Sequence, residues 1–394
     1  MENKKTKNYA WVILIVACLA IFSPSYTQYQ LSPIYKDLIT KFSLSNSQFT
    51  SVFSAPMIPA VFLSLIAGLL VDRFGVKVVI TVALTISAIG TTLRITAGTY
   101  SILFISMLMA GFGATFLNAN GAKILCGWFP TEKVSMVMGV FLAASNIGMT
   151  IGMGTTAMIP SISNAFFIAA VISIIVVIIW IIFMKNPSCS IGDKPDALPI
   201  GECLKVVVKS RPVWIVGLCL MFILGANIVV SSFLPAALIS RGISAVSAGV
   251  YASMVAIGSL IGCILAPAVA LKLKNAKLLL FSLSITSAIF VIFSWKMPEG
   301  LLLGICLLTT GVTIGGLMPL LMSIPIRLKE IGPTYAGTAG GFTGTIQLLG
   351  AVIIPTYIVV PLSGNNTNML FVLGGICMVL VCIVCLALPN LDKQ

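Results

Sequence analysis

The chain of 394 residues contains no histidine, and charged residues make up only 8% of it. Histidine is the commonest metal ligand and the commonest general acid or base in enzymes. The sequence also lacks the G-x-x-x-x-G-K-[ST] loop that binds nucleotide phosphates. We therefore expect no enzyme activity, no catalytic residue, no cofactor and no metal site.

The ten cysteines do not suggest disulfides or a metal centre. Eight lie inside apolar runs, and Cys189 and Cys203 lie in a polar loop that we place in the cytoplasm, where thiols stay reduced. Buried cysteine behaves as a small hydrophobic residue. We interpret the cysteines as packing residues.

Long apolar runs dominate the sequence, which is 59% hydrophobic with a mean hydropathy of +1.12. A soluble domain cannot hide that much apolar surface from water. A membrane helix needs about 20 apolar residues. The runs predict an all-α integral membrane protein with twelve transmembrane helices and the lipid bilayer as a partner, at 10–34, 47–70, 77–97, 100–126, 134–158, 162–184, 212–239, 245–271, 277–296, 300–326, 333–361 and 368–388.

The net charge of +13 would suggest nucleic acid in a soluble protein. With twelve spans and a cytoplasmic N-terminus, however, most of the basic residues fall at cytoplasmic ends, as the positive-inside rule requires. We therefore expect a multi-pass protein of the cytoplasmic (inner or plasma) membrane, with both termini cytoplasmic and no nucleic-acid partner. The basic residues at external ends are Lys36, Lys41, Arg94, Arg241 and Lys296, and Arg94 is interpreted as a membrane-border anchor.

The polar segment 185–211 divides the chain into halves that resemble each other. "GAT" at Gly113 precedes a glycine-rich span, and "GVT" at Gly311 precedes another. Parallel repeats with a site between them build one large class of transporters. We predict an N-terminal six-helix bundle at 1–184, a cytoplasmic central loop at 185–211 and a C-terminal six-helix bundle at 212–394, in a monomeric protein.

The stretch "GLLVDRFGVKVV" lies between the second and third predicted spans and contains Gly68, Asp72, Arg73, Gly75 and Lys77. It resembles the signature loop of the major facilitator superfamily, although Val76 stands where that family often has a base. The resemblance implies the major facilitator fold and a conformational switch at these five residues. In the family, the aspartate latches the N-terminal half to the eleventh helix, so we expect Asp72 to set the balance between access states.

Further similarity links "TLRITAGTYSILFISMLMAGFGATFLNANGAKILCGWFP" and "FLPAALISRGISAVSAGV" to the cyanate-permease and nitrate/nitrite-porter neighbourhood. Nitrate porters of that neighbourhood use arginines in helices 2 and 8. The spans 47–70 and 245–271 contain no arginine or lysine. The residues that would imply an inorganic anion are therefore missing.

Polar residues inside membrane spans are candidates for function. The family architecture favours helices 1, 4, 7 and 10 as cavity lining. Each candidate has a plainer interpretation: an interfacial aromatic belt, a snorkelling lysine, or a polar tie between helices. The predicted substrate-binding residues are Tyr26, Tyr29, Asn120, Lys123, Asn146, Asn227, Ser231, Thr309 and Gln347.

These features predict a secondary transporter, or permease, that moves a small-molecule substrate by alternating access. The substrate class is a small organic solute, with anions among the candidates. None of the ten acidic residues falls in mid-membrane, so we expect a facilitator, an exchanger or a symporter whose substrate carries the proton. The alternatives are an exporter of hydrophobic compounds or drugs, suggested by aromatic and methionine-rich spans, and a non-transporting membrane sensor.

Overall fold

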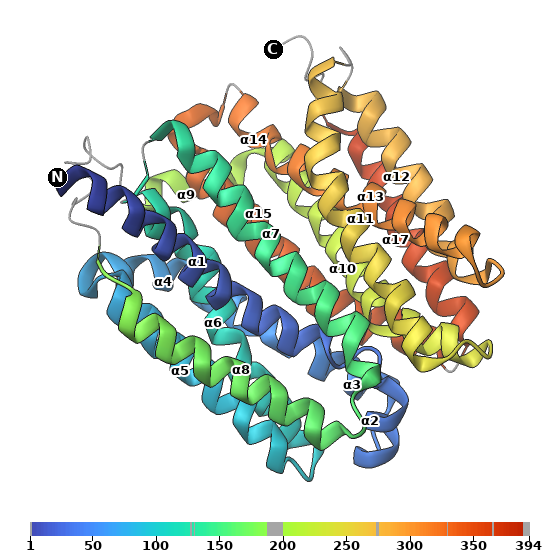
Figure 1. The fold of residues 1–394 in the computed structure, drawn as a ribbon. Helices are drawn as coiled ribbons and strands as arrows, with labels where there is room; N and C mark the ends of the chain where they lie inside the picture. The colour runs from blue at the N-terminus through green and yellow to red at the C-terminus, as the bar shows by residue number, and fades with distance from the viewer. Residues whose placement is uncertain are drawn as a thin grey trace. The chain divides into compact units, whose positions relative to one another are not determined.

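The computed structural model describes residues 2–388, apart from 127, 130, 187–199, 273–275, 329 and 365. The described residues form helices and turns without any strand, which confirms the all-α prediction (Figure 1). Among them, eleven helices are long and apolar enough to cross a membrane. Contacts divide the chain into two units.

The first unit comprises residues 1–44 and 55–196. Its helices are joined by three short 3-10 turns, of which η2 carries the basic residue Arg94. The elements are α1 (Glu2–Tyr29), α2 (Tyr35–Phe42), η1 (Ala55–Met57), α4 (Ile58–Phe74), α5 (Val76–Leu93), η2 (Arg94–Thr96), α6 (Tyr100–Cys126), α7 (Thr131–Thr155), η3 (Thr156–Met158) and α8 (Ile162–Phe183).

Helices α1 and α7 run side by side in the first unit (Figure 1). A Cβ atom on Gly148 would lie 2.5 Å from the carbonyl oxygen of Phe22, and one on Gly152 would lie 2.9 Å from that of Tyr26. Ser25 and Ser145 join the two helices by a hydrogen bond of 2.7 Å between their hydroxyls. Small residues thus bring the two backbones together, as expected for helix pairs in lipid.

The second unit comprises residues 45–54 and 197–394. It contains a π-helical turn, η5, which includes Pro355 and ends two residues before Pro361. The elements are α3 (Asn46–Ser54), α9 (Ile200–Lys209), α10 (Arg211–Ser240), α11 (Ala245–Lys272), α12 (Ala276–Phe293), η4 (Ser294–Lys296), α13 (Leu301–Met322), α14 (Ile324–Arg327), α15 (Gly332–Ile353), η5 (Ile354–Val359), α16 (Val360–Ser363) and α17 (Thr367–Leu386).

The predicted span 47–70 is not one continuous helix. Pro56 lacks the N–H that an α-helix requires at that position, and the chain passes through η1 between α3 and α4. Helix α3 belongs by its contacts to the second unit: the Phe49 ring lies edge-on to that of Phe233 at 6.0 Å, and Asn46 Nδ2 donates to the carbonyl of Gly364. The predicted division at the central loop did not anticipate this placement of 45–54, and the bundle boundaries stay a prediction.

Helices α11 and α13 form a close crossing built from two G-x-x-x-G pairs in the second unit. A Cβ on Gly258 would overlap the carbonyl of Leu308, and one on Gly262 would overlap that of Val312. In the opposite direction, Gly311 meets the carbonyl of Val255 and Gly315 meets that of Ser259. The four glycines let the two backbones touch without intervening side chains.

This crossing predicts a steep difference between two glycines of the same helix. Gly311→Ala forces α11 and α13 apart and should lower stability by about 1–3 kcal/mol. Gly304→Ala is the control, because its added Cβ would have the Tyr251 ring as nearest neighbour at 3.9 Å. Thermal unfolding of the purified proteins in detergent measures both, and equal midpoints for the two variants would contradict the packing argument.

Candidate functional site

The signature turn joins α4 to α5 at Gly75. This residue has φ +82°, a conformation that side chains with a Cβ rarely adopt, and its N–H closes α4 on the carbonyl of Val71 at 2.9 Å. The Arg73 side chain is exposed, and its guanidinium lies 5.2 Å from the centroid of the Phe74 ring. The backbone of Asp72 belongs to α4, but its side chain lies outside the described part. The glycine of the signature turn therefore stands at the position whose backbone conformation favours it.

Asn186 completes this turn, and the sequence reasoning did not single it out. Its side-chain Oδ1 accepts the backbone N–H of Lys77 at 2.9 Å, which is a cap on the first turn of α5 supplied by a distant residue. A Cβ on Gly75 would lie 3.1 Å from Asn186 Nδ2, so this amide also uses the space that glycine leaves. The indole N–H of buried Trp180 reaches the carbonyl of Lys77 at 3.4 Å.

Asn120 and Lys123 contact the helix that leads into the signature turn. Asn120 is fully buried, and its Nδ2 donates to the carbonyls of Ala67 at 3.2 Å and Phe116 at 3.0 Å. The half-buried Lys123 donates from Nζ to the carbonyl of Gly68 at 3.1 Å. These contacts tie α6 to α4. They favour a helix-pairing role for both residues, and their substrate role stays a prediction.

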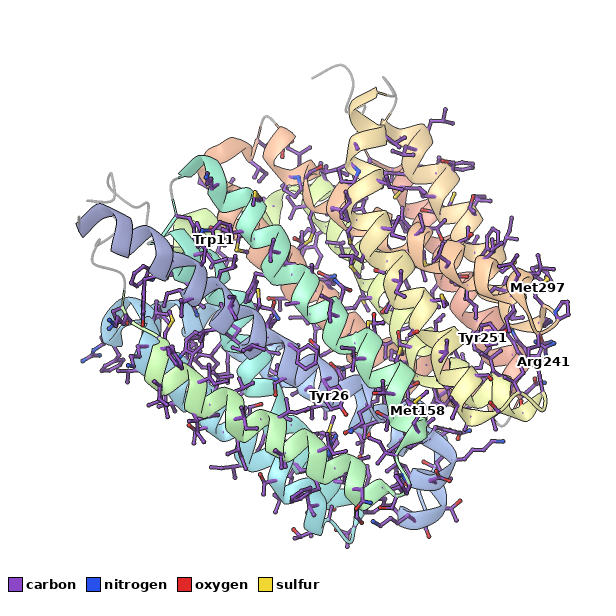
Figure 2. The ribbon with its side chains drawn as sticks, viewed as in Figure 1. Trp11, Tyr26, Met158, Arg241, Tyr251 and Met297 are labelled. Carbon is purple, nitrogen blue, oxygen red and sulfur yellow. The ribbon has the colours of Figure 1, made fainter. Side chains whose placement is uncertain are left out.

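Tyr26 is the most strongly buried aromatic candidate of the first unit (Figure 2). It is 3% exposed, and its ring stacks on Phe22 with centroids 6.0 Å apart. Its hydroxyl accepts a hydrogen bond from Gln30 Nε2 at 3.4 Å. Such burial argues against an interfacial aromatic belt at Tyr26, because belt residues are exposed to the lipid headgroups.

The other two candidates of the first unit are half-buried. Tyr29 is the last residue of α1. Asn146 lies on α7 one residue after Ser145, the partner of Ser25 on α1, and its Nδ2 donates to the carbonyl of Leu142 at 3.2 Å. Asn146 on α7 and Tyr26 on α1 therefore lie on two helices that pack against each other.

Four candidates belong to the second unit. Asn227 and Ser231 are buried one helical turn apart on α10. Thr309 on α13 donates to the carbonyl of Ile305 at 2.8 Å, and Gln347 on α15 donates from Nε2 to Met318 Sδ at 3.7 Å. Thr309 and Gln347 are half-buried, unlike Asn227 and Ser231, and contact of the four with a substrate stays a prediction.

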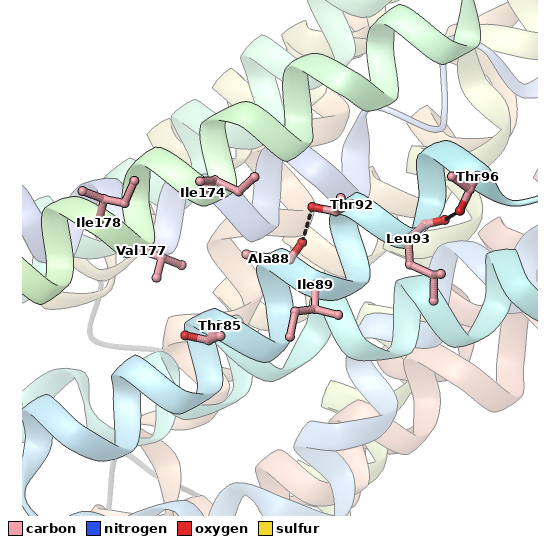
Figure 3. Close-up of a pocket in the computed structure, with 9 residues that line it drawn as sticks. All are labelled: Thr85, Ala88, Ile89, Thr92, Leu93, Thr96, Ile174, Val177 and Ile178. Carbon is pink, nitrogen blue, oxygen red and sulfur yellow. Dashed lines mark hydrogen bonds between the residues drawn. The ribbon is translucent and has the colours of Figure 1, made fainter.

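A groove of about 550 Å³ lies between α5 and α8 in the first unit (Figure 3). The hydroxyls of Thr85, Thr92 and Thr96 in its wall donate to carbonyls of their own helical segments. Beside them, Ile89 and Ile178 are about half exposed. This apolar wall is suited to lipid chains, and none of the predicted substrate-binding residues lines it.

Arg241, a basic residue predicted at an external membrane border, contacts the connection that follows α12 in the second unit. Its Nη1 donates to the backbone carbonyls of Trp295 and Met297 (Figure 2). The hydroxyl of Tyr251 accepts the N–H of Gly300 in the same connection at 3.1 Å. These side chains satisfy backbone groups that follow the end of α12.

The Asn186 cap predicts a local effect of substitution. Asn186→Ala removes the acceptor and should cost about 0.5–2 kcal/mol, as loss of a helix cap does. Asn186→Asp keeps an acceptor oxygen and adds a favourable charge at the N-terminus of α5, so it should retain the cap. Hydrogen–deuterium exchange of the peptide 74–80 should accelerate in the first variant only.

The matched control is Asn164→Ala, since the Asn164 side chain is exposed at the start of α8. Exchange in the peptide 74–80 that stays unchanged in Asn186→Ala would contradict the role of this cap.

The sequence matches the family described as the Major Facilitator Superfamily over residues 11–355. Over 187 residues it is 22% identical to the hexuronate transporter of Escherichia coli K12, a match that covers 47% of this chain and 43% of that protein. Over 292 residues it is 24% identical to the cyanate transport protein CynX of Escherichia coli K12, with 73% of each chain covered. The match to the hexuronate transporter thus spans less than half of that protein.

Among solved structures, the nucleoside transporter NupG superposes with a TM-score of 0.78 at 15% identity, covering 97% of this chain and 99% of that chain. At that identity the likeness concerns the fold alone. The helical architecture, the signature turn at Gly75 and the family match over most of the sequence agree, and the chain belongs to the major facilitator superfamily.

Proposed function

We propose that this chain is a secondary transporter that moves a small organic solute across the cytoplasmic membrane by alternating access. The observation that carries the proposal is the family match over residues 11–355. Within it, the signature turn has at Gly75 a positive φ angle, a backbone conformation that favours glycine. The absence of histidine and of a nucleotide loop from the sequence argues against a chemical step.

The solute class that we propose is a small organic anion. One relative is a hexuronate transporter and another a cyanate transport protein, and both of those names describe anionic substrates. The spans 47–70 and 245–271 lack the arginines that nitrate porters use there, so an organic carboxylate suits this chain better. Hydroxyl and amide groups can bind it, and we assign these roles to Tyr26, Asn146, Asn227 and Ser231 on α1, α7 and α10.

The orientation and the assembly are further parts of the proposal. Basic residues cluster at the predicted cytoplasmic ends, which supports cytoplasmic termini. We propose that a monomer suffices for transport and that nucleic acid is not a partner.

Counterflow in proteoliposomes tests the proposed function. Vesicles containing the purified protein are loaded with glucuronate, lactate, benzoate, glucose or glycine, and entry of the same radiolabelled solute is followed. We expect exchange of at least one of the three carboxylates and none with protein-free vesicles. Exchange of glucose or glycine alone would contradict the anion class. Binding without exchange of any solute would favour the sensor.

Asp72 should affect the transport rate more than solute binding. The signature turn lies at the end of α4, and none of the residues assigned to the solute belongs to that helix. In Asp72→Asn we expect the initial rate to fall at least about tenfold, corresponding to about 1.4 kcal/mol in the barrier, with an unchanged dissociation constant. Glu299→Gln, at an exposed position, is the control for loss of an acid. Loss of binding with an intact fold would place Asp72 in the solute site.

A further inference from the structure

Arg94 is a fully buried charge, with 0% of its side chain exposed. The sequence predicts a border anchor at this position, and the structure instead buries the guanidinium inside the first unit. Across the described residues no carboxylate lies against it. Burial of a charge without a counter-charge is costly and is retained in membrane proteins mainly where it has a function. The contacts of Arg94 therefore indicate what that function is.

The guanidinium connects three helices at the end of α5. Nη1 donates to the carbonyl of Thr27 at 2.9 Å and contacts Met107 Sδ at 3.5 Å. Nη2 donates to Gln30 Oε1 at 2.6 Å, and the guanidinium carbon lies 4.1 Å from the centroid of the Phe166 ring. The shortest hydrogen bond is the one to Gln30, and bonds to a charged donor are stronger than neutral ones.

This bond fixes the direction in which the Gln30 amide points. Arginine only donates hydrogen bonds, so the oxygen of the Gln30 amide must face Arg94 and the NH₂ group must face away from it. The NH₂ group then donates to the carbonyl of Ala165 at 2.7 Å and to the hydroxyl of Tyr26 at 3.4 Å. The Tyr26 oxygen is consequently an acceptor toward Gln30.

The Tyr26 hydroxyl keeps its own hydrogen for a different partner. It accepts the hydrogen bond from Gln30 and so does not use this hydrogen there. The hydrogen of the Tyr26 hydroxyl is therefore available to a solute. The bonds run in one direction, from Arg94 through Gln30 to Tyr26, and such series of hydrogen bonds polarise each member in the same sense.

We propose that Arg94 is a positioning residue that, through Gln30, sets the Tyr26 hydroxyl as a hydrogen-bond donor to a carboxylate of the solute. The solute carboxylate accepts the hydrogen that Tyr26 does not use toward Gln30. This inference rests on the proposed function, in which Tyr26 contacts an organic anion. It gives a buried cation an influence on anion binding without direct contact between them.

The test compares variants that keep the packing but alter the direction of these hydrogen bonds. Gln30→Glu still pairs with Arg94, but its carboxylate accepts hydrogen bonds only, so Tyr26 must donate to it. We expect the KM for whichever of glucuronate, lactate and benzoate exchanges fastest to rise about tenfold, with little change in the maximal rate. Arg94→Met, which has no hydrogen-bond donor, should raise the KM similarly, and Arg94→Lys, which can still donate to Gln30, should restore part of the affinity.

We call the hydrogen bonds from Arg94 through Gln30 to Tyr26 the relay. Two further variants distinguish an effect of the relay from an effect of simple packing. Met107→Leu removes a contact of Arg94 that lies outside the relay, and its KM should equal that of the wild type. In a Tyr26→Phe background, Gln30→Glu should cause no additional rise in KM, because the hydroxyl that it acts on is gone.

The outcomes distinguish failure of the relay from failure of the proposed function. If Tyr26→Phe raises the KM but Gln30→Glu leaves it unchanged, the solute site stands and the relay is wrong. If Gln30→Glu raises the KM equally with and without the Tyr26 hydroxyl, its effect does not pass through Tyr26 and the relay is again wrong. If Tyr26→Phe itself has the wild-type KM, the role of Tyr26 in the solute site and the relay are both wrong, while transport stands. If the wild type exchanges no solute, the proposed function falls and the relay with it.

Discussion

Hydrocarbon offers no water to a polar group, and the arrangement of the described residues follows from that constraint. Backbone groups are satisfied inside helices, and side-chain hydroxyls in the spans mostly turn back onto carbonyls of their own helix, as Thr85 and Thr92 do. Helices then attract one another mainly through close packing. The crossing of α11 and α13 shows this most plainly, because its glycines place backbone against backbone.

The same constraint gives special weight to the few polar groups that point between helices. The Gln30 amide touches Arg94, Tyr26 and Ala165, so a single side chain links α1 to η2 and α8. Asn186 performs a comparable task outside the apolar region by capping α5 from the end of α8. In both places a polar side chain satisfies groups distant in sequence, and the local geometry of the unit depends on it.

Much of the architecture could be predicted because membrane helices are encoded locally. A run of about 20 apolar residues spans the bilayer whatever its neighbours are, and the glycine of the signature turn is required by a backbone conformation. The break at Pro56 was also open to prediction, since proline removes an N–H from the helix interior. That α3 groups with the second unit was not, because the partners Phe233 and Gly364 lie far along the chain.

The sequence by itself determined the all-helical membrane class, the positions of most spans, the signature turn and the family, because hydropathy, proline and glycine act within one helical turn or one run. Tertiary structure decided which polar residues meet. Arg94 is interpreted as a border anchor from its place at the end of a span, yet packing buries it against Thr27 and Gln30. Packing also places Asn120 and Lys123 against the backbone of α4, a contact that their positions in the sequence do not predict, and their substrate role stays a prediction. A side chain's partner in lipid depends on the rotation of its helix and on the neighbour across the interface, and neither is encoded in the hydropathy of a single span.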